Sequence, residues 1–203
     1  MFRVPSSRLI TAPLALAATA AAFLGTGTPA HAARLGIACP APTSTPFAAW
    51  GDHASYAAVP DGGLENGSAG WTLRGGARVV RGNEPFGPGK HSLLLPAGSS
   101  ATTAPMCIGL LSSRMRFFLR SAGAPNSRVR VQVVYDGGLG ALAGLFDSGS
   151  VKAGPAWAPS TPISMLGGLA PALTRDVRFR FTPLGSDAGV RIDDVYLDPL
   201  IHR

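Results

Sequence analysis

The sequence has few of the residues that build metal and redox centres. It contains two cysteines and four histidines in 203 residues, and they form no Cys-x-x-Cys or His-Glu-x-x-His pattern. Zinc and thiol-redox sites need such ligands at short spacing, so neither is expected. The nucleophile-elbow pattern of hydrolases is incomplete, because segment 67–70 is one residue short of it. The phosphate-loop pattern is also incomplete, because Pro88 follows the glycine-flanked segment 82–87. We predict that the protein is not an enzyme.

Acidic residues and lysines are also scarce. The chain has 18 basic and 11 acidic residues, a net charge of +7, and after Arg8 only Lys90 and Lys152 are lysines. Arginine forks match phosphate and carboxylate groups, which suggests an anionic polymer as partner. We prefer a second explanation, a GC-rich genome whose codons favour Arg, Ala, Gly and Pro together. Nucleic acid is not an expected partner.

Long apolar runs are missing after the first 24 residues. Arg3 and Arg8 precede an uncharged apolar segment, and Ala30-His31-Ala32 follows it with the small-x-small pattern of a cleavage site. A membrane span needs about 20 apolar residues, and this run is shorter and contains Pro13. We therefore predict a signal peptide over 1–32, a secreted, extracellular mature protein and no membrane span in its mature form.

The mature part has the pattern of an all-β protein. Residues 33–54 are rich in Ala, Pro and Thr and predict an extended N-terminal arm, whereas 55–203 is expected to form one sandwich domain. Apolar runs recur there about every ten residues between Gly, Pro, Asn and Asp, as in sandwiches. The runs predict strands over 56–59, 70–74, 77–81, 92–95, 102–108, 114–120, 128–135, 142–147, 160–165, 177–182 and 190–197.

Strict alternation supports these strands in three places. Within 114–120, 128–135 and 177–182, arginine alternates with Val, Phe, Met or Leu. A period of two with one apolar face is typical of a half-buried antiparallel strand. The one helical candidate, 163–173, contains two glycines and a proline, so at most a short turn is expected there.

The two cysteines of the mature chain are Cys39 and Cys107. An even number of cysteines in an exported protein indicates a disulfide, and two allow a single pairing. The alternative is two buried free thiols. A bridge that closes so long a loop could contribute about 4 kcal/mol to stability.

Three segments resemble the jelly-roll, galactose-binding-like carbohydrate-binding modules. They are the opening Asp61–Trp71, the strand Gly89–Leu95 and the closing Val190–Leu197 with its Ile-Asp-Asp-Val. Two more, Gly76–Phe86 and Pro96–Thr102, are similar to a group of secreted actinobacterial proteins of uncharacterised activity. The sequence departs from the modules at Leu64, where phenylalanine is usual, and few aromatic residues are left to form a sugar platform.

The resemblance also implies a structural calcium ion where the first and last strands meet. Glu65 and Asp193 would be ligands, with backbone carbonyls near His91, because Ca²⁺ prefers several hard oxygen atoms. Asp194 replaces Asp193 if a β-bulge changes which side chain faces inward. The alternative is that these acids are solvated residues at strand ends.

Arginine rows could form a ligand surface if the three alternating strands are neighbours. Arg128, Arg130, Arg178 and Arg180 would then share one face with Phe118 and with Arg114, Arg116 and Arg120. Guanidinium groups beside an aromatic ring can hold an acidic polysaccharide, although an ordinary solvated face has the same pattern. Trp157, in a proline-rich loop, is a candidate stacking ring.

These observations predict a secreted, non-catalytic module that binds extracellular or cell-envelope glycan or another anionic envelope polymer. The alternative is a structural or protein-interaction protein of the envelope with no small ligand. A hydrolase with an unrecognised site is a third hypothesis.

We predict that Cys39 and Cys107 form a disulfide in the exported protein. Alkylation without reductant should then label no thiol in an intact-mass measurement, and prior reduction should lower the melting temperature because it frees the unfolded chain. Two labelled cysteines in the unreduced protein would contradict the pairing.

Overall fold

The structure is a computed structural model that describes residues 41–107, 114–125, 127–135, 144–165 and 176–198. The chain divides into two units, Met1–Ala32 and Ala33–Arg203, and all described residues belong to the second. The predicted signal peptide and Cys39 lie outside the described residues, so cleavage and the disulfide to Cys107 stay predictions.

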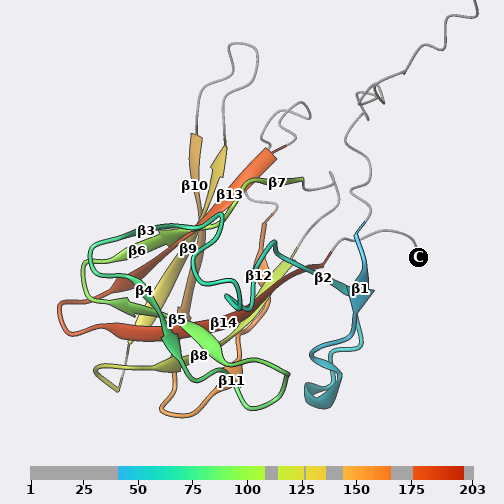
Figure 1. Ribbon diagram of the computed structural model, residues 1–203, viewed down its shortest axis with the longest axis horizontal. Helices are drawn as coiled ribbons and strands as arrows, with labels where there is room; N and C mark the ends of the chain where they lie inside the picture. The colour runs from blue at the N-terminus through green and yellow to red at the C-terminus, as the bar shows by residue number, and fades with distance from the viewer. Residues whose placement is uncertain (1–40, 108–113, 126, 136–143, 166–175, 199–203) are drawn as a thin grey trace, which may run out of the picture. The chain divides into compact units, whose positions relative to one another are not determined.

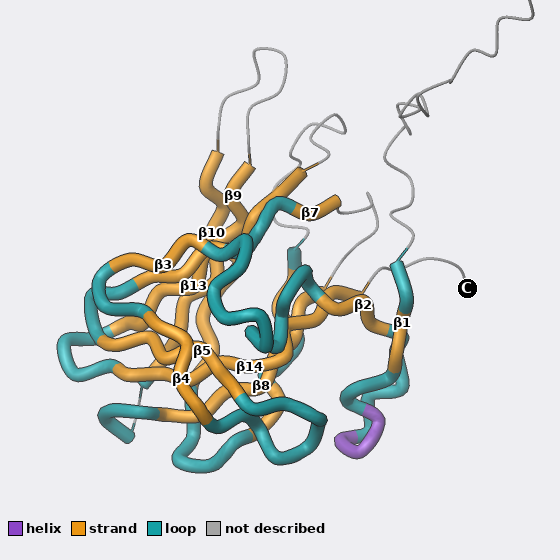
Figure 2. The backbone as a smooth tube through the Cα atoms, in the orientation of Figure 1, coloured by secondary structure: helices purple, strands orange, loops and turns teal. Residues whose placement is uncertain are grey.

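Two antiparallel sheets face each other (Figures 1 and 2). Sheet A consists of β1 (Thr43–Ser44), β2 (Tyr56–Ala58), β4 (Arg78–Arg81), β5 (His91–Pro96), β8 (Arg114–Ser121), β11 (Ala158–Pro159), β12 (Ile163–Ser164) and β14 (Gly189–Asp198). Sheet B consists of β3 (Thr72–Arg74), β6 (Ser100–Thr102), β7 (Met106–Cys107), β9 (Arg128–Tyr135), β10 (Gly144–Lys152) and β13 (Asp176–Leu184). The predicted all-β antiparallel sandwich is confirmed.

The core lies between the sheets and is built by the alternating strands. Alternate residues of β8, β9 and β13 point inward and are buried in the core: Met115, Phe117, Leu119, Val129, Val131, Val133, Val177, Phe179 and Phe181. Their arginine neighbours therefore point to the two outer faces, because successive strand residues face opposite sides. Core packing thus decides where the charged side chains lie.

Two predicted strands are each interrupted. The prediction over 102–108 corresponds to β6 and β7, because the Thr103 hydroxyl accepts the Phe179 amide at 3.0 Å and Pro105 has no N–H to donate. Of the prediction over 160–165, only β12 forms a strand, and β11 ends just before it; between them the Ser160 hydroxyl accepts the Phe117 amide at 3.1 Å. Side-chain hydroxyls replace ladder partners in both places. Part of the predicted turn over 163–173 lies outside the described residues.

Strand β14 occupies the centre of sheet A. One edge pairs with β8 along most of its length, while the other pairs first with β5 and then with β2. The register against β8 shifts between Asp193 and Tyr196, and Asp194 has a left-handed φ of 45°. This β-bulge lies between the part of β14 that pairs with β5 and the part that pairs with β2. There the amide of Val59, the residue after β2, donates to the Val195 carbonyl at 2.9 Å.

A second apolar cluster covers the outer face of sheet A. Phe47, from the predicted arm, packs with Tyr56 and Phe118 and is fully buried. The guanidinium of Arg116 lies 4.3 Å from the centre of the Phe47 ring and bonds the Asp52 carboxylate at 2.5 Å. The arm pairs with β2 through β1, and the single-turn helix η1 (Ala48–Trp50) follows. The arm therefore covers part of the outer face of sheet A.

Within the described ranges, no helix has the length and apolar character needed to cross a lipid bilayer.

Candidate functional site

The outer face of sheet B is polar and strongly basic. Register pairs Arg180 of β13 with Gln132 of β9, and Thr182 with Arg130, so these side chains share the face opposite the core. The outward positions whose side chains the structure describes carry six basic residues, Arg74, Arg128, Arg130, Lys152, Arg178 and Arg180, and the acid Asp147; Asp176 holds the outward register position at the start of β13. The four arginines predicted to act together are thus on one surface.

Arg130 and Arg128 have exposed partners within sheet B. Arg130 Nε lies 3.3 Å from Asp147 Oδ2, and both side chains are about half exposed. Arg128 donates hydrogen bonds to the Ser150 hydroxyl, at 3.0 Å from Nη2 and 3.3 Å from Nε. Exposed pairs of this kind contribute little free energy because water screens them. The guanidinium groups can therefore exchange these partners for an anionic ligand.

No aromatic ring stands among the described outward positions of sheet B, and here the prediction of a shared aromatic was wrong. Phe118 lies on β8 of sheet A, 2% exposed, with Phe47, Trp50 and Phe86 against it. Arg114, Arg116 and Arg120 are also on β8, so they do not join the sheet B arginines. Strand β8 pairs with β14, β11 and β12 rather than with β9 or β13.

Trp157 is likewise separate from the sheet B face. It is half-buried at the edge of the second apolar cluster. The guanidinium carbons of Arg120 and Arg191 lie 5.9 and 5.7 Å from its ring centroid. The Trp157 ring therefore already has two cationic neighbours within the chain.

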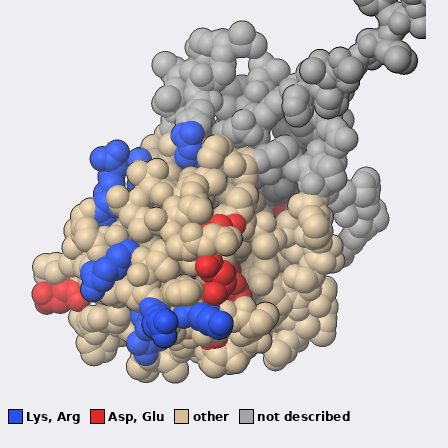
Figure 3. All heavy atoms as spheres, viewed as in Figure 1, with Lys and Arg blue, Asp and Glu red and all other residues tan. Residues whose placement is uncertain are grey.

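A cluster of carboxyl groups surrounds the β-bulge of β14. Asp193 accepts the backbone amides of Glu84 and Asp194, both at 2.9 Å, and the carboxyl groups of Glu84 and Asp194 both lie beside Gly87. Glu84 and Asp193 are 1% and 2% exposed. Figure 3 shows acidic side chains grouped near the middle of one face, beside basic ones. Two buried carboxyl groups in contact need a proton or a cation between them.

Glu65 lies at the border of this cluster. Its Oε1 accepts the amides of Lys90 and His91 at 2.7 and 2.9 Å, and its Oε2 is 3.2 Å from His91 Nδ1. These backbone hydrogen bonds lower the pKa of Glu65, with Lys90 the largest contributor. Glu65 therefore holds the start of β5 against the loop that follows β2.

Burial makes the ionised forms of the two aspartates costly. Desolvation, reinforced by the charges of Asp194 and Glu84, raises the pKa of Asp193 to about 7. Desolvation and the charges of Glu84 and Glu65 raise the pKa of Asp194 to about 6. Burial raises the pKa of Tyr196 to about 12, and the charges of Asp194, Glu84 and Asp193 add to this effect. The cluster is an electronegative spot that would favour a bound cation.

Two glycines leave room for the Glu84 and Asp194 carboxyl groups. A Cβ on Gly87 would stand 2.6 Å from Glu84 Oε1 and 3.2 Å from Asp194 Oδ2. A Cβ on Gly63 would stand 2.7 Å from Asp194 Oδ1. The Phe86 amide donates to Glu84 Oε2. Backbone thus approaches both carboxyl groups closely, as carbonyl ligands do around Ca²⁺.

The predicted metal ligands are therefore placed differently from the expectation. Asp193 and Glu65 mainly accept backbone amides, while Glu84 and Asp194 face one another. The possibility of a bulge at Asp194 was visible in the sequence, but Glu84 was missed because it reaches Asp193 from 109 residues away. In their present rotamers, no three described Asp, Glu, His or Cys side chains form a metal shell. A calcium ion held by Glu84 and Asp194 would need carbonyl oxygens and water as further ligands.

Comparison with known proteins shows the fold. No family model matches the chain and no curated protein matches it, but solved structures do. The xylan-binding CBM22-1 domain of Paenibacillus barcinonensis Xyn10C matches with a TM-score of 0.51 and 14% identity, over 70% of this chain and 93% of that domain. The chain therefore has the jelly-roll sandwich fold of carbohydrate-binding modules.

Two larger proteins contain a similar domain. The CBM22-1–GH10 modules of Clostridium thermocellum Xyn10B, an endo-1,4-β-D-xylanase complexed with xylohexaose, match with a TM-score of 0.51 and 12% identity over 68% of this chain. This chain spans about a quarter (27%) of that xylanase chain. The enzymatically active domain of bacteriophage CBA120 tailspike protein 4 matches with a TM-score of 0.50 and 16% identity, over 69% of this chain and 21% of that one.

We predict that the metal-free protein becomes less stable between pH 5 and pH 7. The folded state keeps protons on Asp193 and Asp194, whose pKa values are about 7 and 6, whereas an unfolded Asp releases its proton near its ordinary pKa of about 4. The folded state thus binds more protons, and the free energy of unfolding falls as pH rises through this window. Thermal melts in chelator at several pH values measure the slope.

Asp194→Asn should flatten this slope, because it removes one raised carboxyl and its repulsion of Glu84. Asp187→Asn is the matched control, since Asp187 is an exposed acid. A melting temperature that rises from pH 5 to pH 7 would contradict the prediction.

Proposed function

We propose that the domain binds acidic or phosphate-bearing glycan outside the cell, without catalysis, on the outer face of sheet B. The observation that carries the proposal is the excess of positive charge on this face, where outward strand positions hold six basic residues against the two acids Asp147 and Asp176. The jelly-roll fold shared with a xylan-binding domain supports glycan as the ligand class. The predicted signal peptide supports an extracellular location.

Charge, rather than ring stacking, would hold this ligand. The described outward positions of sheet B offer guanidinium forks, the amide of Gln132 and the hydroxyls of Thr72, Thr102 and Thr182, all of which suit carboxylate, phosphate and sugar hydroxyl groups. A neutral polysaccharide would find no ring among them to stack on. The absence of an aromatic therefore favours an anionic polymer over neutral cellulose or chitin.

Binding to immobilised polymers at two salt concentrations tests this proposal. We expect retention on polygalacturonate or teichoic-acid-bearing walls, and loss of retention near 1 M salt, where the screening length falls to about 3 Å. The double variant Arg130→Gln/Arg180→Gln should weaken binding by at least about tenfold, since each arginine supplies charge-assisted hydrogen bonds. Arg114→Gln, an exposed arginine of sheet A, is the control and should bind normally.

Salt-independent retention on chitin or cellulose would contradict the charge-based proposal. Retention on no polymer would favour the alternative, an envelope protein that binds another protein. One observation is in favour of that alternative: Trp50 and Phe86 are 40% and 49% exposed, and their ring centroids lie 4.8 Å apart.

We further propose that a structural calcium ion binds between Glu84 and Asp194, with Glu65 at its border and Asp193 orienting the Glu84 and Asp194 backbone. The ion would supply positive charge in place of the shared proton. It would also tie the loop between β4 and β5 to β14, since Glu84 belongs to the loop and Asp194 to the strand. The support comes from the paired carboxyl groups and from the glycines that make room for them.

A chelator should therefore lower the melting temperature of the wild-type protein near pH 7, and added calcium should restore it, because an ion that binds only the folded state stabilises it. Asp194→Asn should remove this sensitivity, and Asp187→Asn should keep it. An unchanged melt of the wild type in excess chelator would leave the cluster as ordinary buried acids that hold protons.

A further inference from the structure

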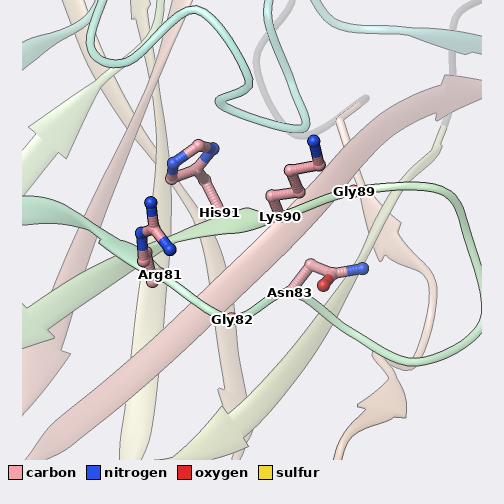
Figure 4. A pocket seen from close by; sticks show the side chains of 6 residues that line it. All are labelled: Arg81, Gly82, Asn83, Gly89, Lys90 and His91. Carbon is pink, nitrogen blue, oxygen red and sulfur yellow. The ribbon is translucent and has the colours of Figure 1, made fainter.

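The strands β4 and β5 enclose a hollow that the proposed glycan face does not use. Its volume is about 450 Å³, and six residues line it: Arg81, Gly82, Asn83, Gly89, Lys90 and His91. Figure 4 shows Arg81, Lys90 and His91 extending to the same side of the hairpin. Small-molecule sites generally occupy about 300–1,000 Å³, so the hollow has room for one sugar.

Two cationic side chains, Arg81 and Lys90, line the hollow. Within the described parts of the chain, neither the Arg81 guanidinium nor the Lys90 ammonium has an ion-pair partner. The nearby carboxylate of Glu65 bonds His91 and two backbone amides instead. Asn83 uses its Nδ2 on the Glu84 carbonyl at 2.5 Å, which leaves its Oδ1 as an acceptor for a hydroxyl group.

The backbone beneath these side chains is firmly held. The Gly82 amide donates to the Lys90 carbonyl at 2.7 Å, which closes the hairpin loop. The Gly82 carbonyl accepts the Ser92 hydroxyl at 2.6 Å and also Arg191 Nη2. Arg191 Nη2 donates in addition to the Arg81 carbonyl at 2.8 Å. Arg81 and Lys90 thus project from a fixed frame, so little backbone ordering is needed when a ligand binds.

We propose that this hollow binds one sugar unit that carries an oxyanion, either the carboxylate of a uronic acid or a phosphate. Arg81, at the end of β4, and Lys90, just before β5, contact the oxyanion from the same side of the hairpin, and Asn83 accepts a hydrogen bond from a sugar hydroxyl. The site lies on sheet A and does not depend on the sheet B face, so either can fail without the other.

Calorimetric titration with glucuronate, glucose 6-phosphate and glucose at low salt tests the site. We expect one of the two anionic sugars to bind at one site, and glucose to bind at least about tenfold more weakly. Preference for glucuronate would identify uronic acids as the source of the oxyanion, and preference for glucose 6-phosphate would identify phosphate-bearing glycan. Arg81→Gln and Lys90→Gln should each weaken binding by about tenfold or more.

Arg78→Gln is the matched control, because Arg78 is an exposed arginine of the same strand whose guanidinium bonds the Gly76 carbonyl. It should bind the anionic sugar normally, as should Arg130→Gln/Arg180→Gln. Unchanged melting temperatures of Arg81→Gln and Lys90→Gln would show that the variants fold. Equal affinity for glucose, wild-type affinity in both pocket variants, or no binding of either anionic sugar would overturn the proposal.

Discussion

Burial of apolar side chains between the two sheets is the constraint that determines the strand register and the position of the polar and charged side chains. Val131, Phe181 and Phe117 are fully buried in one core, and each fixes the direction of its neighbours, because side chains along a strand alternate. A one-residue slip would put arginine into the core, so the register is strongly determined. Polar and charged groups can lie only on the outer faces, in the loops or at a bulge.

The two outer faces are used differently. On sheet A the arm brings Phe47 over Phe118, and Arg116 is held by Asp52 and Ser160 beneath it. On the described part of sheet B no such apolar cluster covers the basic residues, which are half-buried or exposed. This asymmetry makes the outer face of sheet B the basic platform, and a ligand on a face without an aromatic ring would be selected by charge.

The sequence predicted local structure well and spatial neighbours poorly. Alternation located β8, β9 and β13 almost to the residue, because burial of one face leaves a period of two. It could not tell which sheet each strand joins, since all three have the same arginine–apolar pattern, and Phe118 was therefore expected beside Arg130. The acidic cluster was half visible: Asp194 was the alternative ligand if a β-bulge occurred, but nothing local to Glu84 predicts that a loop acid becomes buried beside β14.

The proposed function depends most directly on the outer face of sheet B being the glycan-binding surface. Backbone amide NMR of the labelled protein, titrated with an oligogalacturonate at low salt, measures which strands respond. The account predicts that the largest shift changes fall on outward residues of β9 and β13, including Arg130 and Arg180, and that they vanish at high salt. Shift changes confined to the Trp50 and Phe86 region, or changes on β9 and β13 caused equally by a neutral xylo-oligosaccharide, would contradict it.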